Sequence, residues 1–198
     1  MRNQYFLLRH GQVIYRNHKE TIIYPSPKWL YPSLKEQEKI KLTAAAEKKL
    51  KKLAKKIKKE KIDLIYSSDI LRTRQTAGIM AKELGGLKIS FDKRLRDVTH
   101  GVYAGKTKEE FYRTFPSPPK RFVAKPKGGE NWNDVRKRAK SFLKDIEKKY
   151  KNKKILIVSH GDVLWLLEGI IKHMTNQELL NEIFVKKNFI KPAEFRKL

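Results

Sequence analysis

Four side chains that suit phosphate chemistry follow short apolar runs of the sequence. They are Arg9, His10, Arg72 and His160. The planar guanidinium of arginine offers a fork of N–H donors that matches phosphate oxygens and stays charged. Histidine can act as a nucleophile that carries a phosphoryl group between two easier steps. Because ligands of parallel α/β sheets bind beyond the carboxyl ends of the strands, we interpret these four residues as one candidate phosphate site.

Alternating strand-like and helix-like segments predict the fold that would position these residues. Short apolar runs predict four strands, at residues 5–8, 62–66, 87–91 and 155–158. Apolar residues spaced by three and four predict helices at residues 43–60, 70–84, 132–146 and 163–171. Such alternation is typical of a three-layer α/β/α sandwich with a mostly parallel central sheet. The 198 residues fit a single domain spanning the whole chain, 1–198.

Two segments, residues 18–40 and 116–127, do not fit regular elements. The first carries prolines among Tyr24, Trp29 and Tyr31, and the second carries four prolines together with four basic residues. Long loops in a compact domain are usually either functional or disordered. A lid over the candidate site and plain surface decoration are therefore both open interpretations.

The net charge of +26 raises the local concentration of any anion near this protein. Many of the lysines lie within residues 48–59, around an apolar stripe at helical spacing, which is the pattern of a solvated helix surface. Aromatic residues that would form a stacking platform for bases are missing from this segment. We therefore expect a small or medium anionic phosphorylated substrate and no specific nucleic-acid binding.

The sequence also argues against several other classes of protein and site. It has no cysteine, which excludes disulfides, thiolate zinc sites and cysteine nucleophiles. No apolar run reaches the roughly 20 residues of a membrane-spanning helix, so we expect a cytoplasmic protein without a membrane partner. No histidine stands with carboxylates at a convincing metal-ligand spacing, and we predict no metal and no cofactor. The oligomeric state is left open.

The surroundings of His10 resemble a known family. The hexapeptide LLRHGQ at residues 7–12 closely resembles the LxRHGxT/E signature of the histidine phosphatase superfamily, which is phosphoglycerate-mutase-like. Further matches follow in the family's order, at Leu42-Thr43, residues 66–77, residues 95–105, Gly129-Glu130 before a helix containing Arg136, and VSHGD at residues 158–162. The resemblance covers about residues 5 to 165. It implies a phosphoglycerate-mutase-like fold and a phosphoric monoester hydrolase that needs no metal.

The resemblance also implies a role for each site residue. His10 would be the nucleophile and would take the phosphoryl group on one ring nitrogen while a neighbouring backbone group holds the other. Arg9, Arg72 and His160 would surround the phosphate. Asp97, with Gly101 four residues later, aligns with the family's proton donor to the leaving alcohol. This role requires Asp97 to carry a proton when substrate is bound, and the negative charge of the phosphate favours that form.

Several positions depart from the family's pattern. The acid Asp97 is one methylene shorter than the more usual glutamate, and Gln12 stands where Glu or Thr is common. Val13 and Arg16 replace a serine and an asparagine that phosphoglycerate mutases use at their phosphate site. These changes favour a phosphatase over a cofactor-dependent phosphoglycerate mutase. The mutase and a non-catalytic phosphate-binding module remain the alternatives.

Two further residues join the candidate substrate-binding set because of their place after the signature. These are Gln12 and Arg16. Arg16 would either reach a second anionic group on the substrate or face solvent. The identity of the substrate is not encoded in these motifs, because specificity in this family lies in the loops.

Overall fold

A five-stranded sheet forms the centre of the structure, a computed structural model that describes residues 1–17, 20–24, 26 and 28–198. The strand order is β6-β5-β7-β1-β8. The strands are β1 (Gln4–Arg9), β5 (Leu64–Ser67), β6 (Ile89–Phe91), β7 (Lys154–Ser159) and β8 (Phe195–Lys197). The first four run parallel, and β8 pairs antiparallel with β1 at the edge. The predicted α/β class with a mostly parallel central sheet is confirmed.

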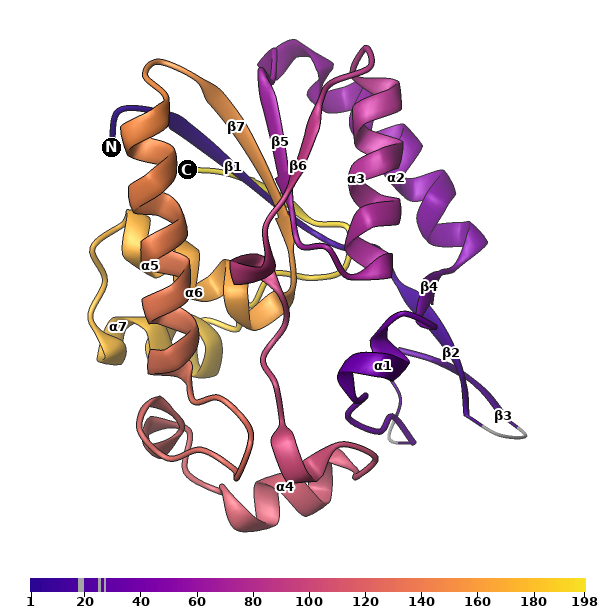
Figure 1. The fold of residues 1–198 in the computed structure, drawn as a ribbon, viewed down its shortest axis with the longest axis vertical. Helices are drawn as coiled ribbons and strands as arrows, with labels where there is room; N and C mark the ends of the chain where they lie inside the picture. Colours follow the sequence, from indigo (N-terminus) through magenta and orange to yellow (C-terminus); the bar gives the residue numbers. More distant parts are fainter. Residues whose placement is uncertain (18–19, 25, 27) are drawn as a thin grey trace.

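Helices cover both faces of this sheet (Figure 1). Helices α2 (Ala44–Ile57) and α3 (Leu71–Glu83) lie on one face, and α5 (Trp132–Lys149) and α6 (Gly161–Ile171) lie on the other. Alternate side chains of β1 enter the two separate cores. Tyr5 and Leu7 pack with α5 and α6, whereas Phe6 and Leu8 pack with α2 and α3. This alternation produces the three layers that the sequence predicts.

Side-chain caps fix where the main helices begin. Thr43 accepts a hydrogen bond from the backbone N–H of Ala46 at 3.0 Å, so α2 begins at Ala44. Asn131 and Asp134 form a reciprocal capping box that begins α5 at Trp132. The predicted helical segment that ends near residue 60 is continued beyond α2 by the short 3₁₀ helix η1 (Lys58–Glu60).

The first segment expected to be irregular, residues 18–40, contains regular elements wherever the structure describes it. Strand β3 (Glu20–Ile23) pairs antiparallel with β2 (Val13–Asn17), and β2 also pairs with β4 (Lys41–Leu42). Helix α1 (Leu34–Gln37) follows β3 and opens with a capping box at Ser33. Residues 18, 19, 25 and 27 of this segment lie outside the described residues. The expectation of an irregular loop was wrong here, because pairing with β2 forms β3 and a capping box at Ser33 begins α1, and neither depends on local periodicity.

The remaining short elements lie between α3 and α5 and after α6. Between α3 and α5 they are η2 (Lys93–Leu95), η3 (Gly101–Tyr103), α4 (Lys108–Thr114) and η4 (Pro119–Phe122). Beyond α6 the chain forms α7 (Asn176–Leu180) and a π-helical turn, η5 (Asn181–Val185). Among the described residues, no helix has both the length and the apolar character needed to cross a membrane.

Candidate active site

His10 follows the carboxyl end of β1 and is only 4% exposed. Its Nδ1 lies 2.8 Å from the carbonyl oxygen of Gly11. Because a carbonyl oxygen can only accept, Nδ1 carries the hydrogen and the lone pair of the ring is on Nε2. The backbone therefore fixes both the tautomer and the orientation of the imidazole, and Nε2 is the nitrogen available for attack.

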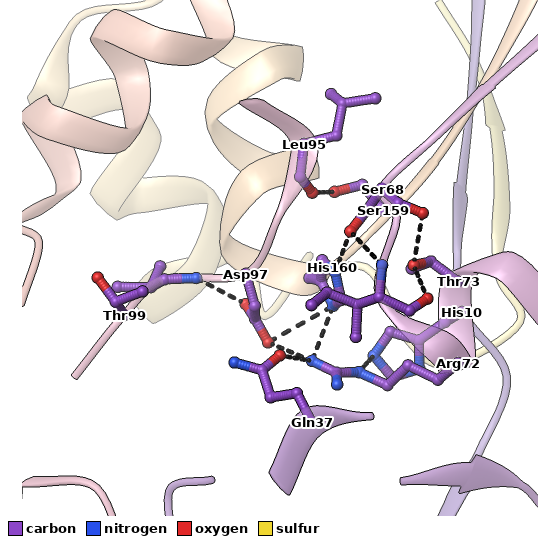
Figure 2. A network of polar contacts seen from close by, with 12 residues as sticks. His10, Gln37, Ser68, Arg72, Thr73, Leu95, Asp97, Thr99, Ser159 and His160 are labelled. Atoms are coloured by element: carbon purple, nitrogen blue, oxygen red, sulfur yellow. Dashed lines mark hydrogen bonds and ion pairs between the residues drawn. The ribbon is translucent and has the colours of Figure 1, made fainter. Parts of the chain in front are cut away.

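Arg72, in the first turn of α3, connects the polar groups around His10 (Figure 2). Its Nε donates to Nε2 of His10 at 3.3 Å. Its Nη2 lies 3.0 Å from Oδ2 of Asp97, 3.1 Å from Oε1 of Gln37 and 3.0 Å from Nδ1 of His160. One buried guanidinium thus joins β1, α1, the loop after η2 and the beginning of α6 at a single point.

His160 is the residue at which α6 begins, and it is fully buried. Arginine can only donate, so Nδ1 of His160 accepts from Nη2 of Arg72. The hydrogen of the neutral ring is then on Nε2, which lies 3.1 Å from Oγ of Ser68. The ring is oriented by these two contacts, and its centroid lies 5.3 Å from that of His10.

Burial and nearby cations keep both histidines neutral. Burial is the largest cause that lowers the pKa of His10 well below its usual value, and the charges of Arg72 and Arg9 act in the same direction. Burial, followed by Arg72 and Arg9, does the same to the pKa of His160. A neutral His10 is what nucleophilic attack requires, because protonation would occupy the Nε2 lone pair.

Arg9, the last residue of β1, directly precedes His10 and lines the same cavity as Arg72. Its Nη1 donates to the carbonyl oxygen of Ile190 at 2.8 Å. Among the described residues, Nε of Arg9 and Nη1 of Arg72 are buried nitrogens without a hydrogen-bond partner. Buried donors without acceptors are costly, and phosphate oxygens are the acceptors that arginine matches best.

Asp97 lies beside these groups, as the sequence predicts, with its side chain 31% exposed. Its Oδ2 is 3.0 Å from Nη2 of Arg72 and 3.5 Å from Nδ1 of His160, and its Oδ1 accepts from the backbone N–H of Val98 at 3.0 Å. The ion pair therefore holds Asp97 next to the guanidinium that also contacts His10.

The loop that carries Asp97 is held by a clamp that the sequence analysis missed. Arg138 of α5 donates to the carbonyl oxygens of Arg94 and Asp97, at 2.6 and 3.2 Å, and pairs with Glu130 at 2.8 Å. Gly101 has a φ of +52°, and a Cβ there would collide with the backbone at residues 127–129. This close approach explains why the loop requires glycine four residues after Asp97.

A cavity of about 380 Å³ opens beside His10. Arg9, Arg72, Asp97 and His100 line it. The other walls are largely aromatic and include Tyr24, Trp29, Tyr31, Tyr112, Trp132, Phe184 and Phe189. The two proline-bearing segments thus reach the cavity, which fits the lid interpretation better than surface decoration.

Four charged or polar residues of the cavity were not predicted as site residues. They are Gln37, Lys108, Arg121 and Asp162. Gln37 comes from α1, inside a segment without helical periodicity, and Arg121 was noted only among the basic residues of the proline-rich loop. Burial raises the pKa of the Asp162 carboxyl, against the opposing effect of the Arg121 charge. The last position of the VSHGD motif therefore places a second carboxyl group in the cavity.

Of the two further predicted substrate-binding residues, Gln12 lies away from the cavity, and the prediction for Arg16 stays untested. Gln12 is exposed and does not line the cavity, because side chains alternate and the next residue, Val13, is the one that faces inward. Arg16 lies in β2, and its side chain lies outside what the structure describes. His173, near the end of α6, is exposed.

Acidification is expected to destabilise the fold partly through His100, whose ring stacks on Tyr31 with centroids 3.7 Å apart. Burial lowers the pKa of His100 to about 4. Since its pKa in the unfolded chain is about 6.5, the stability it contributes is complete above that pH and is lost as the pH falls towards 4. From pH 7 to pH 5 this group alone should remove about 2 kcal/mol from the free energy of unfolding.

Urea unfolding at the two pH values measures this loss. The variant His100→Phe keeps a ring against Tyr31 and cannot be protonated, so it should lose less stability on acidification than the native chain. Equal losses in the two proteins would show that other groups dominate the pH dependence.

The comparisons with known proteins agree with this geometry. The family model "Histidine phosphatase superfamily (branch 1)" matches residues 5–183. Phosphoserine phosphatase 1 of Hydrogenobacter thermophilus is 33% identical over 124 residues, which cover 60% of this chain and 58% of that protein. Phosphoglycerate mutase-like protein 4 of Arabidopsis thaliana is 34% identical over 133 residues, covering 63% of this chain and 57% of that protein. The match therefore spans less than two thirds of the length of these relatives.

Solved structures share the fold at low sequence identity. The mycobacterial glucosyl-3-phosphoglycerate phosphatase superimposes with a TM-score of 0.75 at 20% identity, covering 98% of this chain and 89% of that one. The alpha-ribazole phosphatase of Shigella flexneri also gives a TM-score of 0.75, at 18% identity and with the same coverage. Together with the family match over most of its length, this confirms the resemblance noted in the sequence: the chain belongs to branch 1 of the histidine phosphatase superfamily.

Proposed function

We propose that this chain is a metal-independent phosphomonoester hydrolase that works through a phosphohistidine on His10. One observation carries the proposal. The ring of His10 is fixed by the Gly11 carbonyl with its Nε2 lone pair towards Arg72, in surroundings that lower its pKa well below the usual value. A buried, neutral and oriented imidazole among arginines is suited to attack on a phosphate ester.

The proposed reaction has two steps. The Nε2 lone pair of His10 attacks phosphorus while the bond from phosphorus to the alcohol oxygen breaks, and Asp97 gives its proton to the departing alcohol. Water then attacks the phosphohistidine, Asp97 takes a proton from that water, and inorganic phosphate leaves as His10 is restored. Arg9 and Arg72, with their unpartnered buried N–H groups, stabilise the charge on the phosphoryl oxygens in both steps.

The names of the relatives support a hydrolase, and one of them also supports the alternative of a phosphoglycerate mutase. Two relatives from Hydrogenobacter thermophilus are named as phosphoserine phosphatases, one of them putative, and a third from Arabidopsis thaliana as a metal-independent phosphoserine phosphatase. A relative from Yersinia enterocolitica, 28% identical, is named as a probable phosphoglycerate mutase. We infer a small or medium phosphorylated anion as substrate. The absence of cysteine fits a cytoplasmic location, which is part of the same proposal.

Hydrolysis of p-nitrophenyl phosphate by the native chain tests this proposal. At mildly acidic pH we expect turnover that continues in excess EDTA, because no step of the proposed reaction uses a metal. Vanadate, which resembles phosphate, should inhibit this turnover. Turnover that stops in EDTA and returns with a divalent cation would contradict metal independence. If the chain is inactive, phosphoglycerate supplied with bisphosphoglycerate separates a primer-dependent mutase from a protein that only binds phosphate.

A further inference from the structure

Arg121 is a buried cation without an anionic partner. It lies in η4 and is 9% exposed. Within the described part of the chain, its guanidinium makes one hydrogen bond, from Nη1 to the hydroxyl of Tyr112 at 3.3 Å, and no carboxylate comes within 4.0 Å of it. A guanidinium has five N–H donors, so most of its hydrogen-bonding capacity is unused. None of its nitrogens is among the fully buried, unpartnered side-chain atoms of the described residues, so its remaining donors are accessible to a ligand.

Aromatic rings hold this guanidinium in place without neutralising it. Its central carbon lies 4.3 Å from the ring centroid of Trp132, 5.1 Å from that of Phe111 and 5.6 Å from that of Tyr112. Cation–π contacts at these distances offset part of the cost of burial. They leave the positive charge and the in-plane donors free for an anion, because ring faces accept no strong hydrogen bonds.

Arg121 lines the same cavity as His10. The volume of about 380 Å³ is within the range of sites that hold a whole small ligand, so the alcohol part of an ester fits here as well as its phosphate. Besides Arg121 and the charged residues around His10, the charged residues that line the cavity are Lys108 and Asp162. Lys108 donates to the hydroxyl of Tyr24 at 3.2 Å, and Asp162 is too far from Arg121 to form an ion pair.

We propose that Arg121 is a specificity-determining residue that binds a second anionic group, a carboxylate or a second phosphate, on the alcohol part of the substrate. The inference rests on the proposed function, because it assumes that the first phosphate lies against His10. The substrates of this site are then phosphomonoesters whose leaving group is itself charged. A monoester of a neutral or cationic alcohol lacks the partner that Arg121 requires.

Two matched pairs of substrates test the proposal. Phosphoserine and phosphoethanolamine differ by one carboxylate, and fructose 1,6-bisphosphate and fructose 6-phosphate differ by one phosphate. The native chain should show a higher kcat/KM for the more anionic member of at least one pair, and the pair that shows it identifies the second anion. In Arg121→Met, which keeps an apolar side chain against the rings, this preference should fall about tenfold to a hundredfold, the value of a charged hydrogen bond.

The controls separate recognition from structure. In Arg121→Met, turnover of the less anionic substrates should stay within about twofold of the native rate, and the exposed neighbour Lys120→Met should change no ratio. A loss in Arg121→Met of the same size for both members of a pair would overturn the proposal, and so would a native chain without preference in either pair.

The subsite can also be measured without catalysis. If the native chain hydrolyses none of the four compounds, calorimetric titration of the native chain with the same compounds decides the inference, whereas p-nitrophenyl phosphate decides the proposed function separately. Tighter binding of a more anionic member that is lost in Arg121→Met supports the second-anion site. Equal affinities within both pairs overturn it.

Discussion

Replacing His10 with alanine is expected to lower kcat for p-nitrophenyl phosphate by at least about 10⁴-fold, the usual cost of removing a covalent nucleophile. The reason is specific to Nε2, the ring nitrogen that the Gly11 carbonyl leaves with its lone pair. The variant keeps Arg9, Arg72 and His160, so it should still bind phosphate or vanadate. Steady-state rates and inhibition constants of the two proteins measure the two effects separately.

A trapping experiment distinguishes a nucleophile from a residue that only supports the fold. Native protein quenched in alkali during turnover of a radiolabelled substrate should carry base-stable, acid-labile label on the peptide that contains His10. His10→Ala should carry none. His173→Ala, which replaces an exposed histidine, should match the native chain in rate and labelling. A folded His10→Ala protein that keeps more than about a tenth of the native rate would exclude His10 as nucleophile.

The core of the site could be predicted from the sequence because it depends on parallel strand ends. Arg9 and His10 follow β1, and His160 follows the adjacent strand β7, which is paired with β1 over its whole length. Short apolar runs locate such strands, and their order matters little because the carboxyl ends of parallel strands meet at one edge. Arg72 is predictable for the same reason, since it begins the helix that follows β5.

The outer part of the site could not be predicted, because long-range packing places it there. Gln37 contacts Arg72 from the four-residue helix α1, and Arg121 enters the cavity from a 3₁₀ turn. Neither element is long enough to show periodicity in the sequence. The direction of Gln12 was missed for another reason: a shift of one residue along an extended chain reverses the side on which the side chain lies.

The structure separates the many surface lysines from the few cations that line the cavity. The lysines of α2 lie on exposed positions around a buried stripe of Ala46, Leu50, Ala54 and Ile57, as the periodicity predicts. The cations that reach the cavity, Arg9, Arg72, Lys108 and Arg121, come from other elements. We therefore expect substrate recognition to depend on these four side chains, and the α2 lysines to contribute only a general attraction for anions.

Asp97→Asn is expected to lower kcat/KM for an alkyl phosphate by about 10²- to 10⁴-fold but for p-nitrophenyl phosphate by less than about tenfold. An alkoxide needs a proton as it leaves, whereas nitrophenolate is stable as an anion. The parameter kcat/KM reports events up to the first irreversible step, so a slower attack of water on phosphohistidine does not obscure the comparison. That second defect should appear separately, as accumulated phosphoenzyme when the variant turns over the aryl ester.

Asp162 supplies the matched control, because it and Asp97 are the two carboxyl groups among the described residues that line the cavity. Asp97 contacts Arg72, which connects it to His10, whereas burial raises the pKa of Asp162 and so favours a proton on it even without substrate. If Asp97 is the acid, Asp162→Asn should change the two substrates by the same factor. The loss that depends on the leaving group could instead appear in Asp162→Asn and not in Asp97→Asn. Asp162 would then be the proton donor, and the ion pair of Asp97 with Arg72 would only position the guanidinium.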